Sequence, residues 1–268
     1  MKTAKKIYMA LLFSFLYIPI GVMIVYSFNA SKSRAVFTGF TLRWYRDLFS
    51  NELILQSLAV TLVIALISSV VATVIGTAAA VGINSMRKLP RQIVLNISYM
   101  PVLNPEIITG VSLMLLFVVG KAFFGSQLFG WPTLLIAHIT FNLPYVILSV
   151  MPKLRQMDPR LYEAALDLGC NRKQAFFKVV LPEISPGIIS GFLMAITYSI
   201  DDFIISYFTS GTLQTLPIVI FSMTRKKVSP EINALSTIMF AVVLSVLLII
   251  NFKDSRDEKR NAAPKEEV

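Results

Sequence analysis

Long apolar runs alternate with short polar segments along most of the chain. Six runs have about the 20 residues or more that a helix needs to cross a bilayer: Ile7–Phe28, Ile54–Ile83, Ile93–Val119, Thr133–Val150, Ile184–Phe208 and Ala234–Phe252. Because the first run is longer than the apolar core of a signal peptide, we expect it to remain as a helix. The pattern predicts an all-α membrane protein with six transmembrane helices.

Positive charge is distributed unevenly over the segments between these runs. The formal net charge of +10 would suggest nucleic-acid binding on a soluble protein. With a cytoplasmic N-terminus, however, seventeen of the 25 Lys and Arg residues fall on cytoplasmic segments, as the positive-inside rule requires. We therefore expect both termini in the cytoplasm and no nucleic-acid partner. Residues 1–252 form the predicted membrane domain, and the charged tail 253–268 is expected to be disordered.

A polar segment, the predicted cytoplasmic loop 152–183, carries the signals of a short helix. Asp158 is a good N-cap, Pro159 suits the first helical position and Gly169 suits the C′ position. These signals predict a helix over Pro159–Leu168. Its periodicity puts three side chains on one face, namely Leu161, Ala165 and Leu168.

A second helix is predicted in the same loop. Asn171 and Gln174 have the spacing of a capping box, and we expect Pro182 to end this helix. A plain solvated connection is the simpler interpretation of the loop. A DNA-binding helix-turn-helix is another, because Ala165 and Gly169 imitate one, but membrane helices tether the loop at both ends.

Three carboxylates fall inside apolar runs that contain no Lys or Arg: Glu106, Asp201 and Asp202. An aspartate at the centre of a transmembrane helix costs about 2.5–3.5 kcal/mol, so such residues normally face a cavity or a transport pathway. The alternative is a structural role, in which neighbouring helices satisfy each carboxylate. Adjacent helical positions differ by about 100°, so Asp201 and Asp202 need not face the same site.

Other residues in these runs suggest what surrounds the carboxylates. Pro101 and Pro105 predict a kink or break just before Glu106. Tyr198 lies in the same run as the Asp pair and could line a path for an elongated cation, although ordinary helix packing explains most aromatic residues of this run. The single histidine, His138, is expected to be a packing residue with satisfied hydrogen bonds.

The cytoplasmic loop carries the pattern Glu-Ala-Ala-x3-Gly-x9-Ile-x-Leu-Pro, with valine at the isoleucine position. This pattern resembles the signature of the permease subunits of binding-protein-dependent ABC importers. The resemblance implies the type I importer (MetI-like) fold and a loop that couples the membrane helices to an ATPase. The residues that match the signature, and to which it assigns coupling, are Glu163, Ala164, Ala165, Gly169, Leu181 and Pro182.

Further stretches are similar to the second permease subunit of spermidine/putrescine importers, the PotC type: Thr41-Leu-Arg-Trp-Tyr, Ile200-Asp-Asp-Phe and Val228-Ser-Pro-Glu-Ile-Asn. By this resemblance Trp44, Glu106, Asp201 and Asp202 match positions implicated in polyamine passage. Glu106 stands where the resemblance implies an aspartate. For Trp44 an interfacial aromatic anchor is an equal alternative.

The resemblance also implies partners: a sister permease, two ATPase subunits and an extracellular polyamine-binding protein, in the inner (plasma) membrane of a bacterium. The sequence has no Gly-x4-Gly-Lys-Ser/Thr loop, so ATP and Mg²⁺ are expected on the partner ATPase and no cofactor or metal on this chain. No catalytic residues are expected either. Import of another solute, such as iron or thiamine, and a stand-alone cation-coupled transporter are the alternative functions.

Overall fold

The computed structural model describes residues 2–31, 36–124, 129–226, 230–242 and 244–245, and they are almost entirely helical. The only β-pairing in these ranges is an isolated bridge between Asn29 and Phe40. The chain divides into two compact units: Leu53–Val219, and the combined segments before and after it. The predicted disordered tail, 253–268, lies outside the described residues.

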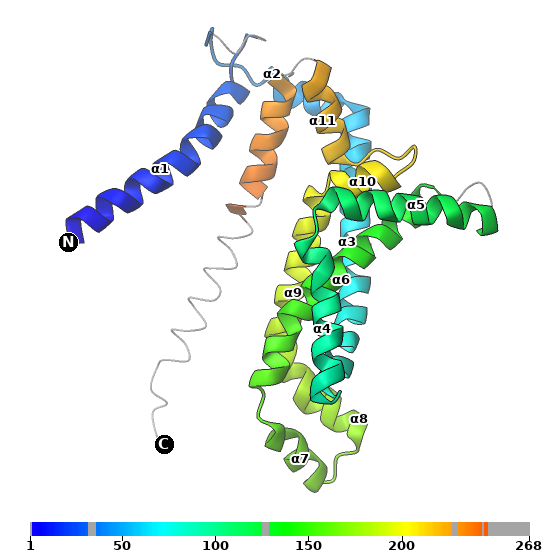
Figure 1. Cartoon of the computed structure of the whole chain (residues 1–268). Coiled ribbons are helices and arrows are strands. Elements are labelled where there is room, and N and C mark those ends of the chain that lie inside the picture. The colour runs from blue at the N-terminus through cyan, green and yellow to red at the C-terminus, as the bar shows by residue number, and fades with distance from the viewer. Residues whose placement is uncertain (1, 32–35, 125–128, 227–229, 243, 246–268) are drawn as a thin grey trace. The chain divides into compact units, whose positions relative to one another are not determined.

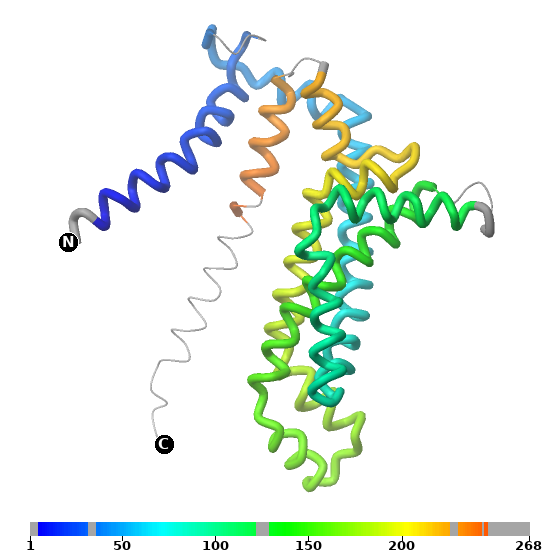
Figure 2. The backbone as a smooth tube through the Cα atoms, in the orientation of Figure 1, coloured from blue at the N-terminus to red at the C-terminus, as the bar shows by residue number. Residues whose placement is uncertain are grey.

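The Leu53–Val219 unit is a bundle of long helices with short helices at its two ends (Figure 1). The helices α3, α4, α6 and α9 run side by side, with α7 and α8 at one end and α5 and α10 toward the other (Figures 1 and 2). Their bounds are α3 Glu52–Asn84, α4 Lys88–Leu103, α5 Glu106–Phe124, α6 Trp131–Gln156, α7 Pro159–Asp167, α8 Arg172–Ala175, α9 Leu181–Asp201 and α10 Ile204–Thr209.

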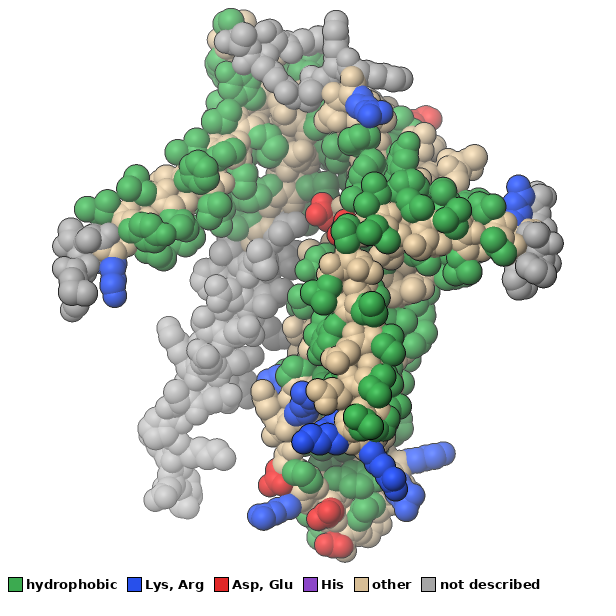
Figure 3. All heavy atoms as spheres, in the orientation of Figure 1, with side chains coloured by type: hydrophobic (Ala, Val, Ile, Leu, Met, Phe, Trp, Pro, Cys, Tyr) green, Lys and Arg blue, Asp and Glu red, His purple; other side chains and the backbone are tan. Residues whose placement is uncertain are grey.

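Small residues bring α9 close to α6 in this bundle. A Cβ atom added to Gly187 would lie 2.9 Å from the carbonyl oxygen of Ser149, and one added to Gly191 would lie 3.2 Å from Cα of Val146. The contact belongs to a buried core that includes Val150. Figure 3 shows apolar side chains along the bundle and Lys and Arg side chains gathered at the α7–α8 end, as expected for a membrane-embedded bundle.

The second unit contains α1 Lys2–Ser27, which is long and apolar, and the short α2 Arg43–Ser50. The side chains of α1 are almost all exposed in the isolated chain. The last helix with complete bounds, α11 Leu216–Lys226, crosses from the first unit into the second. The sixth expected span is helical over 234–242, and its end lies outside the described residues.

Within the described residues, four helices are long and apolar enough to cross a membrane: Lys5–Ser27, Glu52–Asn84, Trp131–Gln156 and Arg172–Asp201. The broken pair α4 and α5 adds a fifth candidate, whose halves meet at 103°. The break predicted from Pro101 and Pro105 is thus confirmed, and it lies at Asn104–Pro105. Residue 104 is extended, as the position before a proline prefers.

Two predictions about the fifth span are wrong. It is not one helix from Ile184 to Phe208, because α9 ends at Asp201 and α10 begins only at Ile204. Pro182 does not end the preceding helix either, since the helix runs on from Arg172 to Asp201. A π-helical turn at Phe176–Val180 precedes the proline, and its wider hydrogen bonding accommodates the missing N–H.

Candidate functional site

The three carboxylates predicted inside the membrane lie close together in the Leu53–Val219 unit. Glu106 begins α5 directly after the break, Asp201 ends α9, and Asp202 lies between α9 and α10. The charge of Glu106 interacts with those of Asp202 and Asp201. Glu106 and Asp201 are exposed in the isolated chain, whereas Asp202 is 7% exposed. Two carboxylates are therefore free to meet a ligand, and the third is enclosed.

Local sequence places Glu106 at this point. Asn104 is extended and Pro105 turns the chain, so Glu106 starts a new helix almost at right angles to α4. An acidic side chain in the first turn is also favoured by the helix dipole.

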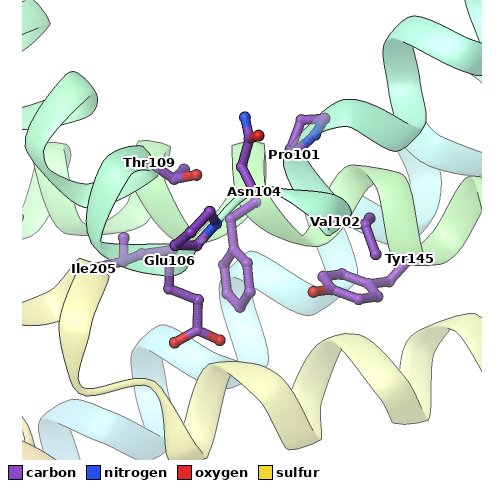
Figure 4. Close-up of a pocket in the computed structure, with 9 residues that line it drawn as sticks. Pro101, Val102, Asn104, Glu106, Thr109, Tyr145 and Ile205 are labelled. Carbon is purple, nitrogen blue, oxygen red and sulfur yellow. The ribbon is translucent and has the colours of Figure 1, made fainter.

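A pocket of about 220 Å³ lies beside this break. Its wall consists of residues from α4, the break, α5, α6 and α10: Pro101, Val102, Asn104, Pro105, Glu106, Thr109, Phe141, Tyr145 and Ile205. Figure 4 shows the Tyr145 hydroxyl directed toward the side of the pocket where the Glu106 carboxylate lies. The pocket thus combines one carboxylate with aromatic and apolar walls.

Two tyrosines add an aromatic surface next to the acidic residues. Tyr145 of α6 and Tyr198 of α9 have ring centroids 4.4 Å apart and an interplanar angle of 31°. Phe141 meets Tyr145 edge-on. Tyr198 was predicted to lie in the site, but Tyr145 was missed. Its signal in the sequence is the spacing of 138, 141 and 145, which puts a histidine and two aromatic rings on one helical face.

Asp202 is held by backbone and side chains rather than left open. Its Oδ1 accepts a hydrogen bond from the Ile205 N–H (3.1 Å), and its Oδ2 accepts one from the Ser206 N–H (2.7 Å). His138 of α6 places Nε2 3.5 Å from the same Oδ2. The predicted packing role of His138 is confirmed, since it is 1% exposed and both ring nitrogens have serine partners.

Trp44 belongs to the other unit. It is 3% exposed, and its Nε1–H donates a 2.6 Å hydrogen bond to the backbone oxygen of Asn29. Beside it, the hydroxyls of Tyr45 and Ser27 are 2.7 Å apart. These contacts tie α2 to the end of α1, while the substrate role of Trp44 stays a prediction.

The predicted capping of α7 is confirmed at both ends. The Asp158 carboxylate accepts a hydrogen bond from the Arg160 N–H at 3.0 Å. At the other end the N–H of Cys170 bonds the carbonyl of Ala165 and that of Gly169 bonds Leu166, which is a Schellman motif. Gly169 has φ +89°, a conformation that glycine adopts without strain.

The residues of the loop signature are mostly accessible. Glu163, Ala164, Gly169 and Pro182 are exposed, Leu181 is half-buried, and Ala165 is buried. The Asn171–Gln174 capping box forms as predicted, with hydrogen bonds of 2.9 and 3.0 Å. Leu161 and Leu168 of the predicted face are exposed, so α7 presents apolar side chains and a carboxylate to a partner.

Residues 72–252 match the family described as binding-protein-dependent transport system inner membrane component. The chain belongs to this family of transport permeases. The permease is therefore a membrane transport subunit of an ABC importer and not an enzyme. In the part of the chain that the structure describes, no group of three or more His, Cys, Asp or Glu could hold a metal.

Individual relatives extend the match over nearly the whole permease. It is 36% identical to the spermidine/putrescine transport system permease protein PotC of Haemophilus influenzae, over 92% of this chain and 93% of that one. It is 38% identical to the putrescine transport system permease protein PotI of Escherichia coli, over 92% and 89%.

A solved structure supports the fold. The crystal structure of a bacterial ABC transporter involved in the import of the acidic polysaccharide alginate matches with a TM-score of 0.70 and 14% identity. The match covers 93% of this chain and 95% of that one. At this identity the likeness shows the shared MetI-like permease fold.

Proposed function

We propose that the permease is the transmembrane subunit of an ATP-driven importer that moves polyamines, spermidine or putrescine, into the cytoplasm. The observation that carries this proposal is the grouping of Glu106 and Asp201 next to the contacting rings of Tyr145 and Tyr198. The names of relatives such as PotC and PotI support the same cargo.

The chemistry of the group matches a polyamine. Such a molecule carries ammonium charges separated by methylene segments. The exposed carboxylates of Glu106 and Asp201 can pair with the ammonium groups, and tyrosine faces can attract the cations and cover the methylenes. The side chains of a conduit must also release what they accept, so binding in this pathway is expected to be weak. Selectivity is then set mainly by an extracellular binding protein.

The proposed topology has six spans with both termini in the cytoplasm, within a membrane domain of residues 1–252. In this arrangement the loop 152–183 faces the cytoplasm, in keeping with the Lys and Arg side chains gathered at the α7–α8 end (Figure 3). The exposed Glu163 and Ala164 and the turn at Gly169 would dock on an ATPase subunit.

The proposed complex contains a sister permease, two ATPase subunits that hold ATP and Mg²⁺, and the binding protein. This permease contributes half of the membrane pathway, including Asp201, Glu106 and Tyr198. Trp44 would support transport indirectly, by holding α2 to the backbone after α1, and Asp202 would act from behind Asp201.

Uptake of labelled spermidine and putrescine tests the cargo. Cells that lack the permease but express its partner subunits are complemented with the wild type or with Asp201→Asn, with and without ATP depletion. We expect ATP-dependent uptake that the wild type restores and the variant reduces. Uptake of iron or thiamine in place of polyamine would overturn the cargo. Polyamine uptake that persists without ATP and follows an ion gradient would instead favour a stand-alone transporter.

A further inference from the structure

The Asp202 side chain stabilises the break between α9 and α10. An interrupted helix leaves backbone N–H groups without partners, and inside a membrane no water is at hand to bind them. Asp202 supplies acceptors for two of these groups, with one oxygen on the Ile205 N–H and the other on the Ser206 N–H. A carboxylate used in this way has little capacity left for a passing ammonium group.

A chain of hydrogen bonds beside Asp202 connects four helices. His138 Nε2 lies 3.0 Å from Oγ of Ser206 and 3.5 Å from Oδ2 of Asp202, which accepts the Ser206 N–H. On its other side His138 Nδ1 lies 2.6 Å from Oγ of Ser199, and this oxygen is 3.2 Å from Oγ of Ser68. The chain therefore joins α3, α9, α6 and α10, and all its members are buried.

Neutral His138 has a partner for each ring nitrogen in this chain. With its proton on Nε2, Ser199 donates to Nδ1 and Nε2–H donates to Ser206, and with its proton on Nδ1 both bonds run the other way. In either tautomer His138 joins Ser199 of α9 to Ser206 of α10, beside the Asp202 carboxylate. The arrangement fixes both the position of the carboxylate and the place at which α9 stops.

We propose that His138 and Asp202 are positioning residues that hold the α9–α10 break and so place Asp201 beside Glu106. Asp201 is the last residue of α9 and is exposed, whereas Asp202 turns inward. In this division Asp201 meets the cargo and Asp202 serves the backbone. The assignment rests on the proposed polyamine pathway, but the claim about the break does not.

A double-mutant cycle on uptake tests the positioning claim. If His138 acts through Asp201, we expect His138→Phe and Asp201→Asn each to raise the KM for spermidine about tenfold. The KM of the double variant should then exceed that of the weaker-binding single variant by at most about twofold. His138→Gln, which keeps a donor and an acceptor, recovers part of the affinity. An unchanged KM in His138→Phe, or effects that multiply in the double variant, would overturn the claim.

Thr140→Val is the matched control for this cycle. Thr140 lies on the same helix, and its hydroxyl bonds the Ile136 carbonyl of that helix at 2.7 Å. We expect its KM to equal that of the wild type.

Hydrogen–deuterium exchange of the assembled transporter in nanodiscs tests the break without reference to cargo. His138→Phe and Asp202→Asn should speed exchange in residues 203–209 at least about tenfold, while Asp201→Asn and Thr140→Val should not. Equal exchange in all variants would refute the assignment. If the wild type takes up no polyamine, the proposed function fails, and exchange alone decides whether His138 and Asp202 hold the break.

Discussion

The rings of Tyr145 of α6 and Tyr198 of α9 contact each other with their centroids 4.4 Å apart, next to the carboxylate of Glu106. Only Tyr198 could be nominated from the sequence, because the pairing depends on how α6 and α9 pack. The two rings are the clearest aromatic surface near the acidic group in the Leu53–Val219 unit, and they suggest a direct test of how the permease contacts an elongated cation.

Replacing Tyr145 by leucine should raise the KM for spermidine about three- to tenfold, because a ring face attracts a cation by about 0.5–2 kcal/mol. Tyr145→Phe keeps the ring and should stay within about twofold of the wild type. Uptake kinetics at matched amounts of membrane-inserted protein provide the measurement. Equal losses in the two variants would show that the hydroxyl, rather than the ring, matters.

Gly169 offers a test of the loop that depends on backbone conformation alone. Its φ is +89°, and nothing lies within 4 Å of a Cβ atom added there. Gly169→Val should therefore cost about 1–2 kcal/mol through strain, distort the Schellman turn and reduce uptake. Gly169→Asn should retain more uptake than Gly169→Val, since asparagine tolerates a positive φ better than valine does. ATPase co-purification and uptake are measured together. If Gly169→Trp transported normally, the docking assignment would be lost.

Glu163 tests the charge of the same surface. Glu163→Lys should abolish coupling, with insertion into the membrane intact and co-purification of the ATPase reduced about tenfold, as for a lost charged contact at an interface. The control is Glu183→Lys, the same reversal at another exposed carboxylate, on the first turn of α9. Similar losses in both variants would point to net charge instead of a specific contact.

Trp44 is expected to affect stability more than affinity. Trp44→Phe removes the N–H group that donates to the Asn29 backbone oxygen. Trp44→Ala leaves a cavity at a buried position and should lower the free energy of unfolding by about 3–5 kcal/mol. Both should lower the amount of protease-resistant permease while the remaining transporters keep a near-normal KM. A many-fold rise in KM at full assembly would instead place Trp44 in contact with substrate.

Gly187 tests the close approach of α9 to α6. A Cβ atom there would lie 2.9 Å from the Ser149 carbonyl oxygen, so Gly187→Ala should lower the free energy of unfolding by about 1–3 kcal/mol. Gly82→Ala is the control, because nothing lies within 4 Å of its added Cβ and alanine favours a helix by up to about 1 kcal/mol. Thermal unfolding of the purified complex in detergent should show a lower midpoint temperature for Gly187→Ala than for Gly82→Ala.

Features with local causes were predicted well from the sequence. Hydrogen bonds between neighbouring residues set the two ends of α7, at Asp158 and at Gly169. Pro105 breaks the third span by its own geometry. The cost of placing carboxylates in a membrane singled out Glu106 and Asp201 as candidates for a pathway, and that role stays a prediction.

Features with tertiary causes were not predictable in this way. The end of α9 has no proline or glycine at 200–203 that would mark it in the sequence. At this break Asp202 accepts hydrogen bonds from the next helix and lies beside His138, which is 64 positions earlier in the chain. Pro182 failed to end a helix because a π-helical turn made room for it. Tyr145 was missed because its partner lies on another helix.

The uninterrupted helix from Arg172 to Asp201 has a mechanical consequence. Its 30 residues form a stiff rod of about 45 Å, so a tilt of about 5° at one end moves the other by about 4 Å. The rod begins just after the turn at Gly169 and ends at the exposed carboxylate of Asp201. A push received near the turn at Gly169 would thus reach the acidic group as a sideways displacement, and the π-helical turn at Phe176–Val180 is the point on the way where the helix can bend.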